Sequence, residues 1–307
     1  MTDTILSLKN VTKKFGRQLA LDNVSLDVKK GDIYGLIGRN GSGKTTIMKV
    51  IADLSKETYG QITLLGHAKE SSKYNQGLNR IGSVIESPAA FNALNAYQNM
   101  KIICLQRGIH DFSVIDETLK FVNLADTGKK KFKQFSLGMK QHLGIAMALV
   151  NQPVFLILDE PINGLDPIAI VELRELLVKI NQERETTIFI SSHILTELYQ
   201  VSTRFGFIHK GKMIQEITKD EFDAIVTEGI VVKVEDAAKA AVVLSENVTD
   251  DFEVLSQHEI KISSTSLSVA EINKLLVVND IYVEGIDKQD YSLEDYYTNL
   301  VNTVGEE

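Results

Sequence analysis

The chain has 307 residues, of which 44% are hydrophobic and 24% charged, with a formal net charge of -8. Apolar residues are plentiful, the 20 glycines follow no repeat and Cys104 is the single cysteine, which excludes a disordered chain, a collagen-like fibre and a disulfide scaffold. No apolar run approaches the roughly 18 to 20 residues of a membrane helix, and the first ten residues lack a leader pattern, so we expect a cytosolic protein.

Segments with strand-like and helix-like apolar spacing alternate along the first two thirds of the chain. Strands are predicted over residues 5–8, 26–28, 33–36, 61–65 and 81–85, and a helix over 45–54. The spacing is helical from residue 95 to about 124, and then predicts a strand over 154–158, a helix over 170–182 and strands over 187–191 and 204–208. This alternation predicts an α/β fold with a helical insertion.

The charge balance changes sign near residue 219. Residues 1–219 contain 28 Lys and Arg against 21 Asp and Glu, whereas residues 220–307 contain 5 against 20, so the balances are +7 and -15. We therefore expect two domains, 1–219 and 220–307. In the second, the spacing predicts a small α/β domain of ferredoxin-like pattern, with strands over 231–234, 252–255, 259–262 and 281–283 and helices over 237–244 and 269–276. It is interpreted as an accessory or regulatory domain, with a solvated structural cap as the alternative.

The positive balance of the first segment does not indicate nucleic acid as a partner. Its basic run, residues 129–133, is short and has no interleaved aromatic stripe. A solvated loop or a docking patch explains this run better, so we expect no nucleic-acid partner.

A phosphate-binding loop is predicted directly after the strand that ends at residue 37. The residues from Gly38 to Thr46 read GRNGSGKTT and fit the pattern GxxxxGK[ST] at every fixed position. The glycines allow the backbone N–H groups to turn inward, the helix N-terminus adds positive potential, and Lys44 supplies an ammonium to the β- and γ-phosphates. Thr45 offers a hydroxyl to Mg²⁺. The predicted nucleotide-binding residues are Gly38, Asn40, Gly41, Ser42, Gly43, Lys44, Thr45 and Thr46.

Two adjacent carboxylates, Asp159 and Glu160, follow the buried strand over 154–158. This position places them at the carboxyl edge of a parallel sheet, where open α/β sheets bind ligands. We expect Asp159 to hold Mg²⁺, directly or through water, and Glu160 to orient and polarise the attacking water.

Further motifs separate the phosphate-loop proteins from one another. A GTPase is not expected, because no Asn-Lys-x-Asp tetrapeptide for guanine occurs. The segment FSLGMKQ, in which Ser136 precedes Asp159 by 23 positions, resembles a degenerate form of the LSGGQ signature of the ATP-binding-cassette (ABC) family. Asp166, in Gly-Leu-Asp, follows Glu160 as the D-loop of that family does, and His193 follows a strand as its switch histidine does. The sequence thus resembles the nucleotide-binding subunit of an ABC transporter.

The resemblance implies a fold and roles for individual residues. It implies a P-loop NTPase fold of the ABC type for residues 1–219, with a helical subdomain at about 87–150, and ATP and Mg²⁺ as cofactors. Phe15 would stack on adenine, with core packing as the alternative. Ser136 and Gly138, at a helix N-terminus, would hold the γ-phosphate of the nucleotide bound by the other subunit, and Asp166 would lie at the same interface. His193 would bind that phosphate and sense its loss.

Glu86 departs from the family pattern. It ends the strand over 81–85 at a position where most of the family carries Gln. A carboxylate near Mg²⁺ and the attacking water adds negative charge, so we expect Glu86 to act as a catalytic and metal-side residue that tunes metal affinity. Glu86 together with the SLGMKQ signature resembles the bacitracin-resistance and lantibiotic-immunity branch of export ATPases.

The resemblance also implies partners and a function. One cassette holds half of each composite ATP site, so a homodimer is expected, with a separate membrane permease that places the protein at the inner face of the cell membrane. The expected function is ATP hydrolysis that powers export of a peptide antibiotic or a related compound. The alternative is a soluble ABC ATPase that acts on ribosomes or DNA, although such proteins usually carry two cassettes or long coiled-coil insertions.

Overall fold

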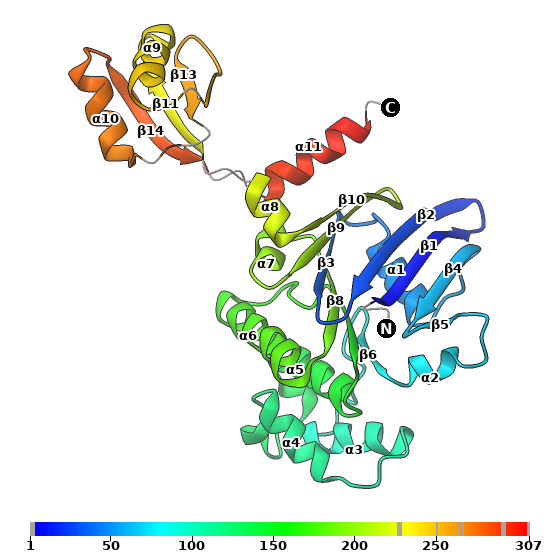
Figure 1. Cartoon of the computed structure of the whole chain (residues 1–307). Helices are drawn as coiled ribbons and strands as arrows, with labels where there is room; N and C mark the ends of the chain where they lie inside the picture. The colour runs from blue at the N-terminus through cyan, green and yellow to red at the C-terminus, as the bar shows by residue number, and fades with distance from the viewer. Residues whose placement is uncertain are drawn as a thin grey trace. The chain divides into compact units, whose positions relative to one another are not determined.

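The computed structural model describes residues 4–225, 229–249, 251–262, 265, 267–289 and 293–305. The chain divides into two compact units, one formed from residues 1–219 and 300–307 and the other from residues 220–299 (Figure 1). The division after residue 219 coincides with the change in charge balance. The charge pattern assigns residues 300–307 to the second domain, whereas the structure groups them with the first unit.

The first unit contains a six-stranded sheet that is almost entirely parallel. Its order is β10 (Lys212–Thr218), β9 (Arg204–His209), β3 (Ile33–Ile37), β8 (Thr187–Ser192), β7 (Phe155–Asp159) and β6 (Ile81–Val84). Only β10 runs antiparallel to its neighbour. Every residue of β3, β7 and β8 is buried, as expected for central parallel strands, and the carboxyl ends of these strands meet at one edge.

A second, antiparallel sheet of the same unit has the order β2 (Gln18–Lys29), β1 (Thr4–Phe15), β4 (Tyr59–Leu64) and β5 (His67–Ala68). One hydrophobic core joins this sheet to the parallel one and includes Leu6, Met48 and Phe189. Met48 belongs to α1 (Lys44–Ile51), so this helix is packed with residues of both sheets. The packing fixes the helix that follows the predicted phosphate loop.

The helices of the first unit are α2 (Tyr74–Leu78), α3 (Ala96–Gln106), α4 (Ser113–Phe121), α5 (Leu137–Leu149), α6 (Pro167–Arg184) and α7 (Leu195–Tyr199). The continuous helical spacing predicted over 95–124 is wrong in detail, because α3 and α4 are separate helices. Gly108 adopts a left-handed conformation (φ 70°) after α3, and Asp111 then accepts a hydrogen bond from the N–H of Ser113 at the start of α4. A glycine C-terminal to a helix and an aspartate before the next one are ordinary helix-ending and helix-starting signals.

The second unit has the ferredoxin-like order of elements, in which strand and helix alternate as βαββαβ. They are β11 (Gly229–Val234), α9 (Ala237–Asn247), β12 (Phe252–Val254), β13 (Glu259–Ile262), α10 (Val269–Val278) and β14 (Val283–Gln289), with the antiparallel sheet order β12-β13-β11-β14. Val232 and Ile260 of the sheet share a core with Leu244 and Leu276 of the helices. Two further helices, α8 (Lys219–Ile225) and α11 (Leu293–Gly305), include the ring pair Phe222 and Tyr296, whose centroids are 5.4 Å apart.

Candidate nucleotide-binding site

The predicted phosphate loop connects β3 to α1. Gly43 is the N-cap of α1 with φ 114°, a conformation that side-chain-bearing residues rarely adopt. A Cβ atom on Gly38 would lie 2.4 Å from Ser42 Oγ and 2.6 Å from the carbonyl oxygen of Ile208, so only glycine fits there. Because the loop leads into the N-terminus of α1, the free N–H groups of the first helical turn face a potential anion.

Lys44 is a buried cation beneath this loop. Its side chain is 4% exposed, and its Nζ atom donates to the carbonyl oxygen of Gly38 at 2.7 Å and lies 3.0 Å from Glu160 Oε1. The hydroxyl of Ser42 is also buried and has no hydrogen-bond partner in the described part of the chain. A buried ammonium fits the phosphate groups of a nucleotide, which would accept hydrogen bonds from it.

A hydroxyl and a carboxylate lie together at the start of α1 and the end of β7. Thr45 Oγ1 donates to Asp159 Oδ2 at 2.7 Å, and Ser191 Oγ of β8 donates to Asp159 Oδ1 at 2.7 Å. Asp159 is therefore oriented from both sides. Hydroxyl and carboxylate oxygens are the donors that Mg²⁺ prefers, so this set fits a magnesium ion.

Glu160 lies between two nitrogen-bearing side chains. Its second carboxylate oxygen, Oε2, is 2.7 Å from Nδ1 of His193, which follows β8, and its backbone N–H donates to Ser191 Oγ. The parallel pairing of Asp159 with Ser191 brings these two strand ends together. Glu160 also has a positive φ of 47°, a conformation that is strained for a residue with a side chain and recurs at functional sites.

These groups border a cavity of about 540 Å³, within the usual size of a small-molecule site. Its lining includes eight of the predicted site residues, which are Phe15, Asn40, Gly41, Gly43, Lys44, Thr45, Thr46 and Glu160. Phe15 ends β1 and is 52% exposed, which excludes the alternative that it packs in the core. Lys13 Nζ lies over one face of this ring, 4.7 Å from its centroid, so a flat base would stack on the other face.

The sequence pattern did not single out the other five lining residues. They are Gln18, Leu19 and Ala20 of β2, with Lys210 and Gly211 of the turn between β9 and β10. In the sequence, Lys210 and Gly211 show only a turn signal. Their place beside the phosphate loop comes from the tertiary pairing of β9 with β3.

Eight predicted residues are not part of this lining. Four of them, Gly38, Ser42, Asp159 and His193, each form a hydrogen bond with a lining residue. Ser136, Gly138 and Asp166 lie on other helices. Ser136 is the N-cap of α5 and accepts a hydrogen bond from the N–H of Met139 at 3.2 Å. Asp166 is the N-cap of α6 and accepts from the N–H groups of Ile168 and Ala169 at 3.1 and 3.0 Å. The signature serine and the D-loop aspartate thus each begin a helix, away from the lining of the chain's own cavity.

Glu86 also lies outside the lining, but next to the strand end that carries Asp159. Val84 of β6 pairs with Leu158 of β7, so both strands end at the same edge of the sheet. Glu86 has a positive φ of 67°, and its carboxylate forms an ion pair with Lys49 of α1. The structure thus gives Glu86 a partner that the sequence does not indicate.

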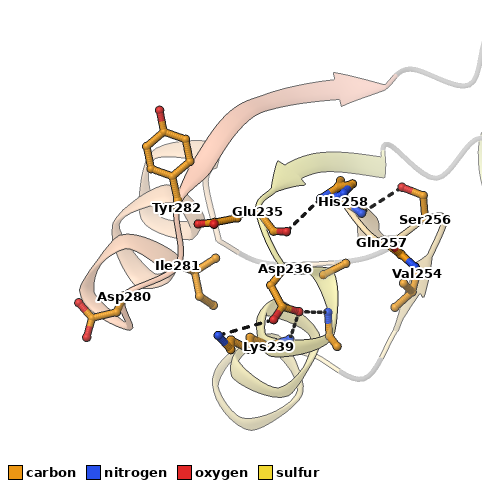
Figure 2. A pocket seen from close by; sticks show the side chains of 12 residues that line it. Glu235, Asp236, Lys239, Val254, Ser256, Gln257, His258, Asp280, Ile281 and Tyr282 are labelled. Atoms are coloured by element: carbon orange, nitrogen blue, oxygen red, sulfur yellow. Dashed lines mark hydrogen bonds and ion pairs between the residues drawn. The ribbon is translucent and has the colours of Figure 1, made fainter.

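The second unit has a larger cavity of about 690 Å³ (Figure 2). It lies where three loops are joined, since His258 Nδ1 is 2.9 Å from the carbonyl oxygen of Glu235 and the N–H of Glu235 donates to the carbonyl oxygen of Tyr282. The lining contributes the carboxylates of Glu235, Asp236 and Asp280 against the ammonium of Lys239. This acidic lining repels phosphates, so the smaller cavity of the first unit is the better candidate for a nucleotide site.

Comparisons with known proteins show the family of the chain. Residues 21–163 match the family model of the ABC transporter. The chain is 42% identical to the bacitracin transport ATP-binding protein BcrA of Bacillus licheniformis, over 98% of this chain and 99% of that protein. It is 45% identical to the lantibiotic transport ATP-binding protein SrtF of Streptococcus pyogenes, over 69% of this chain and 90% of that protein. Both relatives confirm the predicted branch of the family.

A solved structure gives the same fold for the first unit. The dimeric post-hydrolysis state of the ATP-binding cassette MJ0796, bound to ADP and Pi, superposes with a TM-score of 0.62 and 27% identity, covering 70% of this chain and 98% of that one. In the described part of the chain, no helix combines the length and apolar character that crossing a membrane requires. The chain belongs to the ABC transporter family, as an ATP-binding subunit that hydrolyses ATP.

Proposed function

We propose that this protein is the motor of an exporter for a peptide antibiotic and works through a separate membrane permease. The observation that carries the proposal is the placement of Lys44, Asp159 and Glu160 where the phosphate loop meets the end of β7, in a chain that aligns over nearly its full length with a bacitracin transport subunit. Lys44 supplies a cation that binds phosphates, Asp159 an anion that binds a metal, and Glu160 a base that activates water.

The site residues divide the hydrolysis of ATP among them. Phe15 stacks on the base, while Lys44 and Ser42 bind the phosphates from the loop side. Thr45 and Asp159 hold Mg²⁺, which supplies positive charge to the phosphate oxygens. Glu160 orients the attacking water once the phosphates have drawn Lys44 away from its carboxylate, and His193 holds the other carboxylate oxygen in place.

The position of Ser136 supports a homodimer. Ser136 is exposed at the N-terminus of α5 and outside the cavity that its own chain offers to ATP. A second copy that faces the first would place this helix end, with Gly138 and the D-loop residue Asp166, over the γ-phosphate of its partner. The cassette MJ0796 has been solved as such a two-copy assembly with ADP and Pi.

A permease completes the assembly. BcrA and SrtF are named as ATP-binding proteins of bacitracin and lantibiotic transport. We infer that a polytopic membrane protein binds the helical subdomain at about 87–150 and holds this subunit at the inner face of the cell membrane. The lining residues of the nucleotide cavity belong to the first unit, and the acidic second unit is assigned an accessory role.

Resistance of living cells tests this function. The chain is co-expressed with a candidate membrane permease in a bacitracin-sensitive host, and the inhibitory concentrations of bacitracin and of a lantibiotic are measured. We expect the wild-type pair to raise the inhibitory concentration of one antibiotic, and Lys44→Ala, which lacks the phosphate-binding ammonium, to raise neither. The subunit should also pellet with membranes only when the permease is present.

The two readouts separate the parts of the proposal. A subunit that pellets with the permease but protects against neither antibiotic contradicts the cargo. A subunit that stays in the supernatant in both cases contradicts its place in a transporter.

A further inference from the structure

The turn between β9 and β10 forms part of the nucleotide cavity. Lys210 and Gly211 are lining residues, together with Phe15 on the side of the base and Lys44 on the side of the phosphates. Neither residue belongs to a sequence motif that the proposed function uses. Their chemistry is therefore unassigned.

The turn is hydrogen-bonded to the phosphate loop and to β2. The N–H of Gly211 donates to the carbonyl oxygen of Ser42 in the phosphate loop, and the N–H of Asp22 in β2 donates to the carbonyl oxygen of Gly211, both at 2.8 Å. A Cβ atom on Gly211 would lie 2.7 Å from the carbonyl oxygen of Ala20, so the turn and β2 are in close contact. This anchoring holds the neighbouring Lys210 at a fixed place beside the loop.

Lys210 carries a positive charge that the protein does not neutralise. Its backbone is left-handed, with φ 46°, its side chain is exposed, and within the described residues its ammonium has no hydrogen-bond or ion-pair partner. Lys212, two residues on, differs because its Nζ lies 3.3 Å from Asp22 Oδ2 and it does not line the cavity. The same turn thus holds one paired lysine outside the cavity and one unpaired lysine on its border.

The positive charges of Lys210, in the turn, and of Arg39, in the phosphate loop, both act on His209. The pKa of His209 lies below its ordinary value, chiefly because of burial and then because of the positive charges of Lys210 and Arg39. Arg39 belongs to the phosphate loop, so Lys210 and Arg39 both act on one imidazole. An anion in the cavity would relieve this concentration of positive charge.

We propose that Lys210 is a nucleotide-binding residue whose ammonium binds the phosphate chain of ATP at a second point besides Lys44. The inference rests on the proposed nucleotide site and extends it to a β-turn. A lysine ammonium is a compact charge on a flexible stem, suited to a phosphate oxygen rather than to the face of a base.

The test uses two matched substitutions in the full-length chain. Lys210→Asn removes the charge and keeps a residue that tolerates a left-handed backbone, and Lys212→Asn removes an equal charge from the same turn. Dissociation constants of a fluorescent ATP analogue are measured with Mg²⁺ at low and high salt, with thermal melts of each variant. We expect Lys210→Asn to bind roughly five- to tenfold more weakly, with a smaller difference at high salt, and Lys210→Arg to bind like wild type.

Each other outcome overturns the inference in a recognisable way. Equal binding by Lys210→Asn and wild type removes Lys210 from the site and leaves the proposed function intact. Equal weakening by Lys210→Asn and Lys212→Asn shows a general effect of charge rather than a contact. Failure of the wild-type protein to bind the analogue overturns the proposed function and this inference together.

Discussion

The ammonium of Lys44 lies 3.0 Å from one carboxylate oxygen of Glu160, and Nδ1 of His193 lies 2.7 Å from the other. The residue proposed to receive phosphates and the residue proposed to activate water are therefore paired with each other. We expect phosphates to compete with Glu160 for Lys44 and so to release the carboxylate for the water. The pair would then link nucleotide binding to the availability of the base.

The Glu160→Gln variant tests this relationship. Loss of the base should lower the rate of ATP hydrolysis by roughly 10² to 10⁴. Loss of the carboxylate charge also frees Lys44, so the affinity for ATP should rise rather than fall. Steady-state phosphate release and titration with a fluorescent ATP analogue measure the two effects, and Glu175→Gln, on the exposed side of α6, is the control. Normal turnover in Glu160→Gln would remove Glu160 from its role, and weaker binding would contradict the competition for Lys44.

The part of the predicted site that depends on short spacing is the phosphate loop. Gly38 to Thr46 lie on the loop after β3 and on the first turn of α1, so a local pattern contains most of their geometry. The strand ends at Asp159 and His193 follow from apolar runs of fixed length. Their meeting at one sheet edge follows from the parallel pairing that such runs favour.

The contacts that sequence patterns miss join segments far apart in the chain. Lys49 meets Glu86 across 37 positions, and Gly211 meets Ser42 only because β9 pairs with β3. The strands β1 and β2 are also longer than their apolar spacing predicts, since both have 12 residues and many exposed polar positions. Partly exposed strands carry a weaker hydrophobic signal than buried ones, so their ends cannot be read from that signal.

The ion pair between Lys49 and Glu86 gives opposite expectations for two substitutions. If the carboxylate of Glu86 adds negative charge near the metal, Glu86→Gln should raise the Mg²⁺ concentration for half-maximal ATP hydrolysis. Lys49→Gln should lower it, because the carboxylate then lacks its neutralising partner. Both groups are partly exposed, so each shift should be roughly two- to fivefold.

Magnesium titrations of ATP hydrolysis at saturating ATP measure both shifts. Lys120→Gln, in the helical insertion, removes a lysine charge elsewhere and should leave the titration unchanged. Shifts of the same sign in the Glu86 and Lys49 variants would contradict a role of their charges at the metal.

His142 predicts how the stability of the protein depends on pH. It lies on α5, is 5% exposed, and its Nδ1 atom is 3.0 Å from the carbonyl oxygen of Val122. Burial lowers the pKa of His142 below its ordinary value, so the folded chain keeps this imidazole neutral at a pH where the unfolded chain protonates it. The neutral imidazole of His142 therefore costs the folded chain nothing above about pH 6.5. As the pH falls from there toward the folded-state pKa of His142, the free energy of unfolding falls by at most about 1.4 kcal/mol per pH unit.

Urea unfolding between pH 7.5 and 5 measures this dependence. The free energy of unfolding of His142→Gln should fall less with acidification than that of the wild type, because its amide does not titrate and can still donate to Val122. His110→Gln, at an exposed position, should keep the wild-type slope. Identical slopes for the wild type and His142→Gln would show that other groups control acid sensitivity.

Ser136 allows the dimer to be tested without damage to the fold. Its hydroxyl accepts the hydrogen bond from the N–H of Met139 that caps α5. Asp and Asn cap helices as well as Ser does, so Ser136→Asp and Ser136→Asn should both keep α5 intact. The two variants differ in charge. The carboxylate of Ser136→Asp would face the triphosphate held by the partner subunit, and like charges brought together at an interface are unfavourable by several kcal/mol.

In the Glu160→Gln background, which we expect to retain bound ATP, light scattering after size-exclusion chromatography should therefore show dimers for Ser136→Asn and monomers for Ser136→Asp. Both variants should bind the fluorescent ATP analogue equally well, because Ser136 does not line the cavity of its own chain. A dimer of Ser136→Asp as stable as that of Ser136→Asn would mean that this helix end does not face the partner's phosphates. A loss of binding in monomeric Ser136→Asp would instead place Ser136 in its own nucleotide site.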